Sequence, residues 1–138
     1  MKLIELYRYN DTGYNPFLIT EKWQIAQLNY SQEINITCIN KIDKHFKTEE
    51  AFVLLKGTAV LIAAVINKGI VSFETCLMQR GITYNIPKLM WHSIAMKENA
   101  EVIIIENSNT HIDDFEFYHL SKIQQEKLSV LIKKTISS

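Results

Sequence analysis

Short segments in which apolar and polar residues alternate are the feature that most constrains the fold of this chain. Residues 23–30 and 34–39 alternate with a period close to two, which is the pattern of half-buried β-strands. Further strands are expected over residues 51–55, 58–66, 70–78, 84–86, 91–96 and 101–106. Many short strands spaced about 8–12 residues apart predict an all-β antiparallel sandwich or barrel.

The C-terminal stretch has the pattern of a helix. Ser121 and Gln124 have the spacing of a capping box, in which each side chain bonds to the backbone of the other residue. The apolar residues after them fall on one helical face. We therefore expect a helix over about 121–136 that covers an edge or an open end of the barrel. The barrel core is expected over about 20–107, and residues 1–138 are expected to form one domain.

The composition argues against several classes of partner. Fifteen Lys and Arg residues balance fifteen Asp and Glu residues, so the surplus of positive charge typical of nucleic-acid binding is missing. No window approaches the ~18 consecutive apolar residues of a membrane span, and the N-terminal residues lack the apolar region of a signal peptide. We expect a cytoplasmic protein that contacts neither nucleic acid nor membrane.

The stretch KIDKHFKTEEAFVLLKG, residues 41–57, carries the first candidate metal ligands. It places Asp43, His45 and Glu50 just before an apolar strand, and His92 stands near the start of a later one. Imidazole nitrogen and carboxylate oxygen together suit Zn, Fe, Mn or Ni. From the residues alone, a solvated charged turn is the ordinary alternative to a metal site, and both interpretations stay open.

Strand periodicity links these polar residues to candidate pocket residues. Glu50 shares a strand face with Phe52, and His92 shares one with Ile94 and Met96. If these faces line a barrel, polar groups lie at its mouth and apolar groups lie deeper, as in a small-molecule pocket. The predicted pocket-lining residues are Phe52, Tyr84, Ile94 and Met96.

The spacing of two segments resembles the signature motifs of the cupin superfamily. The first runs His45, four residues, Glu50, six residues, Gly57, and the second runs Gly81, five residues, Pro87, four residues, His92. The family motifs are His-x-His, three or four residues, Glu, six residues, Gly, and Gly, five residues, Pro-x-Gly, two residues, His, three residues, Asn. The resemblance implies a jelly-roll barrel in which His45, Glu50 and His92 match the metal ligands of the family.

Three positions depart from the family pattern. The first His is Asp43 here, which can still ligate Fe, Mn or Zn; equally, its presence could mark a lineage that binds no metal. The Gly of Pro-x-Gly is Leu89, so the turn there is expected to be built differently. The Asn after His92 is Met96.

The resemblance implies a function in outline. It implies a small cupin that binds a divalent metal and a small-molecule ligand in its barrel, with isomerase, epimerase or dioxygenase chemistry, and that pairs as a homodimer. Whether the protein is an enzyme stays open. One alternative is a metal-free carbohydrate-binding or sugar-ketoisomerase-like cupin, suggested by Trp91-His92 and by Asp113-Asp114-Phe115. Another is a non-catalytic dimeric binding module. The stretch 111–119 (HIDDFEFYH) is expected to be a solvated turn that leads to the helix.

Overall fold

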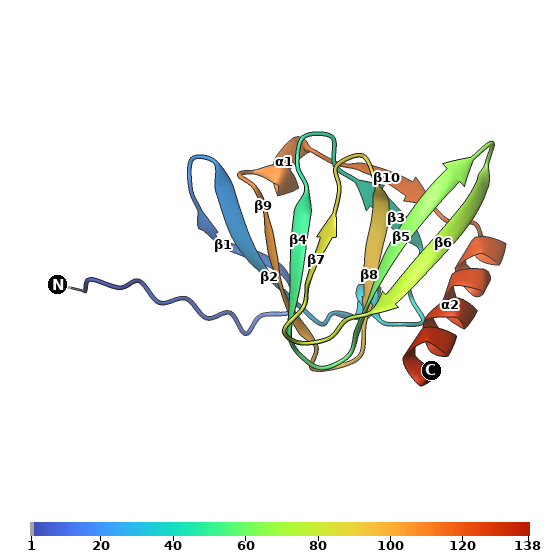
Figure 1. The fold of residues 1–138 in the computed structure, drawn as a ribbon, viewed down its shortest axis with the longest axis horizontal. Coiled ribbons are helices and arrows are strands. Elements are labelled where there is room, and N and C mark those ends of the chain that lie inside the picture. The colour runs from blue at the N-terminus through green and yellow to red at the C-terminus, as the bar shows by residue number, and fades with distance from the viewer. Residues whose placement is uncertain (1) are drawn as a thin grey trace.

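Two five-stranded antiparallel sheets pack face to face, with a helix outside the second sheet (Figure 1). The computed structural model describes residues 2–138. The first sheet has the strand order β1-β2-β9-β4-β7 and the second has the order β10-β3-β8-β5-β6. The strands are β1 (Gly13–Ile19), β2 (Trp23–Asn29), β3 (Lys41–Lys44), β4 (Glu50–Lys56), β5 (Ala59–Asn67), β6 (Ile70–Leu77), β7 (Thr83–Ile86), β8 (Trp91–Met96), β9 (Glu101–Asn107) and β10 (Glu116–His119); the helices are η1 (Gln32–Ile34, 3₁₀), α1 (Thr110–Asp113) and α2 (Lys122–Ser137).

The main core lies between the two sheets. It is built from alternate residues of the strands, because successive side chains of a strand point to opposite faces. In β9, for example, Val102 and Ile104 are buried while Ile105 is 40% exposed. The buried side chains of this core include Ala26, Leu28, Phe52, Leu54, Leu61, Ile86, Ile94, Met96, Val102 and Ile104.

A second core lies between the outer face of the second sheet and α2. Leu128 and Ile132 of the helix are fully buried against Val60 and Ile62 of β5. Burial on both sheet faces explains why β5 is almost continuously apolar. The predicted capping box is present, since Ser121 accepts a hydrogen bond from the Gln124 N–H and the Gln124 side chain accepts one from Ser121. The helix therefore forms where expected, but it covers a face of the sheet rather than an edge or an open end.

The predicted strand over residues 34–39 is wrong. Ile34 is the last residue of the short helix η1, and residues 35–39 form a loop with an isolated bridge between Asn35 and Met96. The side chain of Asn35 accepts hydrogen bonds from the backbone and the hydroxyl of Thr37, a local pattern that competes with strand pairing. The strand beside β8 in the second sheet is β3, which comes from the charged stretch that follows.

Two other strands were not expected from the sequence. β1 lies before the predicted barrel core and contains Pro16, which is tolerated because β1 is an edge strand with a register shift between Pro16 and Leu18. β10 lies within the expected solvated turn 111–119 and pairs in register with β3, Glu116 opposite Lys44 and His119 opposite Lys41. Neither strand has a clear alternation of its own. Among residues 2–138, no helix has the length and apolar character required to cross a membrane.

Leu89 keeps the turn conformation that glycine would supply. Its φ is +70°, in the left-handed region that non-glycine residues rarely adopt. Its backbone N–H donates a 2.7 Å hydrogen bond to the carbonyl of His45. A leucine therefore holds a strained left-handed position here, and the turn joins the His45 loop to the segment before β8.

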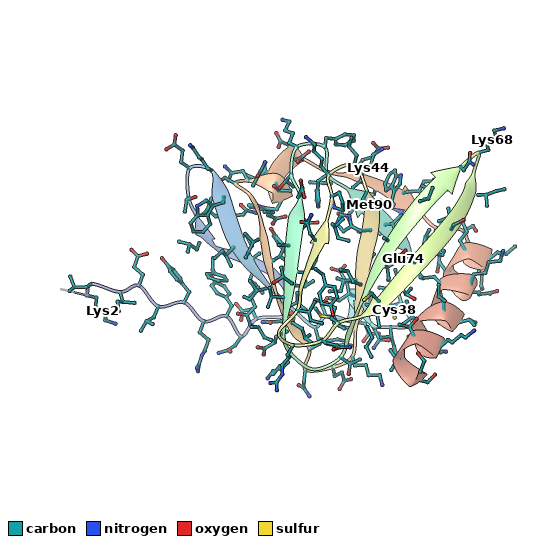
Figure 2. All side chains as sticks on the ribbon, in the orientation of Figure 1. Lys2, Cys38, Lys44, Lys68, Glu74 and Met90 are labelled. Atoms are coloured by element: carbon teal, nitrogen blue, oxygen red, sulfur yellow. The ribbon has the colours of Figure 1, made fainter. Side chains whose placement is uncertain are left out.

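Gly57 ends β4 where the chain passes close to Ala100. Its φ is +82°, and a Cβ atom placed on it would lie 2.6 Å from the Cα of Ala100. Gly69 offers a comparison within the same chain, since its φ of +78° is similar but nothing lies within 4 Å of its added Cβ. Gly69 follows Lys68 at the tip of the β5–β6 hairpin (Figure 2).

We expect Gly57→Ala to destabilise the protein far more than Gly69→Ala. Both substitutions introduce left-handed strain of about 1 kcal/mol, but only Gly57→Ala also forces a side chain against backbone atoms, for a total of about 3 kcal/mol. Urea unfolding monitored by Trp fluorescence gives both values. Equal losses for the two variants would contradict the close approach to Ala100.

Candidate functional site

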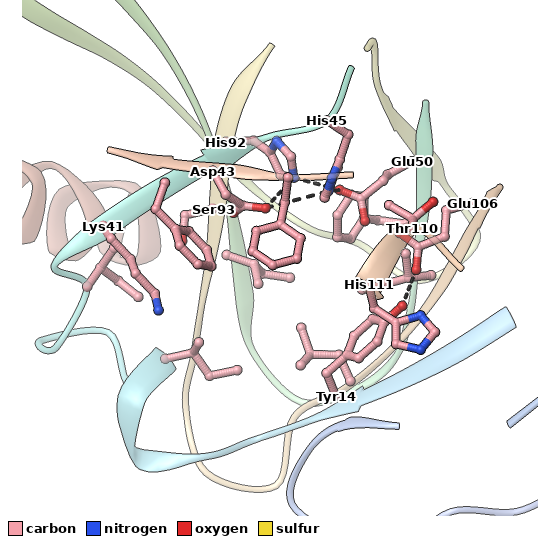
Figure 3. A pocket seen from close by; sticks show the side chains of 18 of the residues that line it. Tyr14, Lys41, Asp43, His45, Glu50, His92, Ser93, Glu106, Thr110 and His111 are labelled. Carbon is pink, nitrogen blue, oxygen red and sulfur yellow. Dashed lines mark hydrogen bonds and ion pairs between the residues drawn. The ribbon is translucent and has the colours of Figure 1, made fainter. Parts of the chain in front are cut away.

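A cavity of about 440 Å³ opens between the two sheets. Its wall combines polar groups near one end with apolar side chains along the rest. Residues of the first sheet and residues of the second sheet both contribute, so the cavity exists only in the folded sandwich (Figure 3). Lining residues include Tyr14, Leu28, Glu50, Phe52, Ile104 and Glu106 from the first sheet, and Lys41, Asp43, His92, Ser93, Ile94 and Phe117 from the second.

Strand register brings the polar residues together in two facing rows. On the second sheet, Asp43 of β3 stands opposite His92 of β8. On the first sheet, Gln24 of β2 stands opposite Glu106 of β9, and the Ala51–Ile105 pair puts Glu50 on the rung opposite Glu106 on the other side. Burial alternation turns all five residues toward the space between the sheets.

Asp43, His45, Glu50 and His92 converge at one point of the cavity (Figure 3). Oε1 of Glu50 lies 2.8 Å from Nε2 of His45 and 2.6 Å from Nε2 of His92. Oδ2 of Asp43 lies farther away, 3.5 Å from His45 Nε2 and 3.8 Å from His92 Nε2. His45, Glu50 and His92 are buried, whereas the Asp43 side chain stays 28% exposed. The four residues that the sequence nominated as ligands are thus brought together by the fold.

Backbone carbonyls fix the orientation of both imidazole rings. Nδ1 of His45 lies 2.6 Å from the carbonyl oxygen of Asp114, and Nδ1 of His92 lies 2.9 Å from that of Met90. Because a carbonyl oxygen only accepts hydrogen bonds, each Nδ1 carries the proton and donates it. In the neutral rings, both Nε2 lone pairs then point at Oε1 of Glu50, which is buried without a hydrogen-bond donor. Three electron-rich atoms at one point require either shared protons or a cation.

When both Nε2 atoms carry protons, His45 and His92 form a buried ion-pair network with Glu50. Burial opposes a positive charge on His45, but the interaction with Glu50 outweighs it and raises the pKa of His45 to about 9. The same balance raises the pKa of His92. Burial also disfavours the charged form of Glu50, yet the bonds from His45 and His92 hold its pKa below the usual range. Burial raises the pKa of Asp43. Protons and a divalent cation thus compete for the same position.

Asp114, in the stretch after β9, holds the His45 loop in place, a role that the sequence did not indicate. Besides its carbonyl bond to the ring, Asp114 accepts hydrogen bonds with its carboxylate from the N–H groups of Phe46 at 2.9 Å and Lys47 at 3.1 Å. Asp114 is buried and lies just before β10. The stretch 111–119 is mostly exposed, as expected, but Asp114 within it clamps the His45 loop and residues 116–119 form β10. Charged residues in a loop give no sequence signal for such a contact.

A second polar group borders the cavity beside Glu50. Glu106 accepts hydrogen bonds on Oε2 from the Tyr14 hydroxyl and from the Gln24 amide, the latter at 2.9 Å. The Gln24 amide also approaches Nδ1 of His111 at 3.1 Å. Burial first, and the neighbouring Glu50 second, raise the pKa of Glu106 to about 7. Glu106 was not among the residues predicted from the sequence, although its alternation with Val102 and Ile104 places it on the inner face.

The four predicted pocket-lining residues divide into two pairs. Phe52 and Ile94 line the cavity. Met96 is fully buried within the main core, at the far end of β8 from His92. Tyr84 packs against the same core, and its hydroxyl accepts a 2.9 Å hydrogen bond from the Gln79 N–H. Neither Tyr84 nor Met96 is part of the cavity lining, because a shared strand face continues past the cavity floor into the core.

The fold has counterparts among solved structures. An RmlC-like cupin family protein with a double-stranded β-helix fold from Methanocaldococcus jannaschii matches with a TM-score of 0.53 at 11% identity, over 80% of this chain and 96% of its own. A cupin-2 domain-containing protein from Shewanella frigidimarina matches with 0.50 at 20% identity, over 72% and 84%. The QdtA 3,4-ketoisomerase from Thermoanaerobacterium thermosaccharolyticum matches with 0.51 at 14% identity, over 67% and 63%.

These matches define the class of fold. No family model and no curated protein matches the sequence. Two five-stranded antiparallel sheets around a central cavity, together with the matched structures, show that the chain has the cupin fold, with a C-terminal helix added to it. Because folds host many activities, the function of this chain has to be argued from its own site.

Replacing the Asp114 carboxylate tests the clamp on His45. Asp114→Ala removes two charge-assisted hydrogen bonds, and we expect a loss of about 2 kcal/mol in the free energy of unfolding. Asp114→Asn keeps one acceptor and is expected to lose less. Asp113→Ala, at the neighbouring exposed residue, is the matched control and is expected to stay within about 0.5 kcal/mol. If Asp114→Ala and the Asp113→Ala control have the same free energy of unfolding, the Asp114 clamp does not stabilise the fold.

Proposed function

We propose that this protein binds one divalent metal ion through His45, Glu50 and His92 and uses it to hold a small carbonyl-bearing molecule in the cavity. The observation that carries the proposal is the convergence of two Nε2 atoms and a donor-free Glu50 oxygen at one buried point. Asp43 is close enough to complete the shell. Imidazole nitrogen with carboxylate oxygen suits Zn, Fe, Mn and Ni alike.

The donor set fits a first-row divalent metal. Such metals bind imidazole nitrogen and carboxylate oxygen at about 2.0–2.2 Å, so two donors at a right angle around one ion lie about 3 Å apart. The Glu50–histidine separations of 2.6 and 2.8 Å are close to this spacing. The carbonyl bonds to both Nδ1 atoms correspond to the support that metal-binding histidines normally have.

The rest of the cavity supports binding of a small organic molecule. Phe52 and Ile94 provide an apolar wall next to the polar cluster, and Phe115 and Phe117 line the same cavity. Lys41 lies over the Phe117 ring at 4.3 Å from its centroid, where it can attract a negatively charged group of the ligand. When bound, a divalent metal supplies a Lewis acid that polarises a carbonyl oxygen. Isomerase or epimerase chemistry follows from such polarisation, and dioxygenase chemistry is the alternative for iron.

A metal-free cupin that acts on a sugar is the second candidate. It is favoured by the raised pKa values of His45 and His92, which give both rings protons to exchange with a sugar carbonyl while Glu50 balances their charge. The matched QdtA ketoisomerase is described in complex with TDP, so a nucleotide sugar is the ligand class to test. A non-catalytic dimeric binding module is the remaining alternative, and the homodimer also stays a prediction.

Metal content distinguishes the two candidates. After incubation with Zn²⁺ or Mn²⁺ and desalting, we expect about one metal ion per chain by inductively coupled plasma mass spectrometry. His45→Ala, His92→Ala and Glu50→Gln each remove a donor, and we expect each to weaken binding at least tenfold (about 1.4 kcal/mol). His119→Ala replaces an exposed histidine of β10 and is expected to retain the metal.

Two outcomes would contradict the metal proposal. One is wild-type protein that retains no metal after this treatment, and the other is retention by all three donor variants. Metal-free wild-type protein that binds a nucleotide sugar by calorimetry, and loses this binding on His45→Ala or His92→Ala, would establish the second candidate instead.

A further inference from the structure

Glu106 is a buried carboxylate next to the metal-binding cluster that the cupin motifs do not include. It lies at the end of β9, outside both motif segments, and is 5% exposed. His45, Glu50 and Glu106 each offer one donor atom, and these three atoms lie within 4.8 Å of one another. The same holds for Asp43, His45 and His92. His45 therefore belongs to two groups of potential ligands, one on each sheet.

Strand register brings Glu106 close to Glu50. The β4–β9 ladder runs through the Ala51–Ile105 pair, so the next rung sets Glu50 and Glu106 opposite each other with both side chains turned inward. Like charges directly opposite on neighbouring strands destabilise a sheet, and burial strengthens the repulsion. Either a proton between the two carboxyl groups or a cation bound by both removes this repulsion.

The surroundings of Glu106 orient it toward the cluster. The Tyr14 hydroxyl and the Gln24 amide both donate to Oε2. The Glu106 carboxyl also faces that of Glu50, and this contact contributes, after burial, to the raised pKa of Glu106. Gln24 is itself fully buried and held, since its Oε1 accepts the backbone N–H of Asn109 at 2.7 Å. Figure 3 shows Glu106 beside Glu50, with Tyr14 on its other side. One carboxylate oxygen is anchored by Tyr14 and Gln24, and the carboxyl group faces Glu50 and the cluster.

We infer that Glu106 is an additional protein ligand of the metal, positioned by Tyr14 and Gln24, and that it adds a second carboxylate donor from the first sheet beside Glu50. The inference rests on the proposed function, because it requires a metal in the His45–Glu50–His92 site. It gives this protein a donor set richer in carboxylate oxygen than the family motif implies. Tyr14 and Gln24 are positioning residues in this arrangement.

Cobalt titration tests the inference with a readout that does not depend on activity. Metal-free wild-type protein is titrated with Co²⁺, and both the affinity and the visible absorption spectrum are recorded, since the spectrum responds to the ligands bound to the ion. Glu106→Gln keeps the size of the side chain and removes its charge. We expect at least tenfold weaker Co²⁺ binding together with a changed spectrum. Tyr14→Phe is expected to weaken binding less and to keep the wild-type spectrum.

Glu101→Gln is the matched control. Glu101 lies on the same strand but on its outer side, where it pairs with Lys56 at 3.2 Å, and this variant is expected to bind Co²⁺ as the wild type does. Glu106→Asp tests the same point if Glu106→Gln does not fold, which thermal unfolding in the presence of a chelator reveals. Its carboxylate is withdrawn by one methylene group, so weaker binding and a changed spectrum are again expected.

Each contrary outcome has its own meaning. If wild-type protein binds Co²⁺ and the Glu106 variant keeps the wild-type spectrum, Glu106 is not a ligand, whether or not the affinity falls. The proposed function survives that result. If the wild type binds no Co²⁺ at all, the proposed metal site and the role of Glu106 both fail.

Discussion

The hydrogen bonds from Nδ1 of His45 and His92 to backbone carbonyls are the constraint on which the site depends. They fix the proton on Nδ1 and direct both Nε2 lone pairs at one oxygen of Glu50. The two Nε2 atoms lie 2.6–2.8 Å from the Glu50 oxygen, and three such acceptor atoms repel one another unless protons or a cation lie between them. The geometry of the cluster therefore calls for protons or a metal ion, and it would not persist with neutral rings alone.

The cupin fold supplies this geometry through strand register and through a few backbone contacts. The pairing of β3 with β8 sets Asp43 beside His92, and the pairing of β4 with β9 sets Glu50 beside Glu106. The His45 loop belongs to neither ladder, so it is held from outside. The N–H of Leu89 donates a hydrogen bond to the carbonyl of His45. Asp114 accepts hydrogen bonds from the His45 ring and from the backbone N–H of Phe46. The site thus joins two sheets and two loops that are distant in sequence.

Much of the fold could be predicted from the sequence, because alternation reports which strand face is buried. The strand at residues 91–96 and the capping box at Ser121 were predicted as the structure shows them. Residues 34–39 alternate as well, but Asn35 forms local hydrogen bonds with Thr37 and this segment does not pair as a strand. The short strands β3 and β10 have too few residues to display a period. They form because they pair with strands that are distant in the sequence: β10 pairs with β3, and β3 also pairs with β8.

The candidate site was predictable only as far as motif spacing reaches. Spacing nominated Asp43, His45, Glu50 and His92, and the fold brings these four side chains together. Glu106 lies outside the motifs, and only the pairing of β4 with β9 shows that it stands opposite Glu50. Asp114 supports His45 from a loop, where residue type alone carries no information about contacts. Tyr84 and Met96 were expected in the lining because periodicity gives the face of a strand but not the depth along it.

Anomalous diffraction from crystals grown with Mn²⁺ or Co²⁺ is the most direct test of the claim that these atoms converge on a metal. The account predicts one strong anomalous peak per chain within about 2.0–2.3 Å of Nε2 of His45, Nε2 of His92 and Oε1 of Glu50. It is contradicted by a map without a peak in the cavity in which both histidines remain bonded through Nε2 to Glu50.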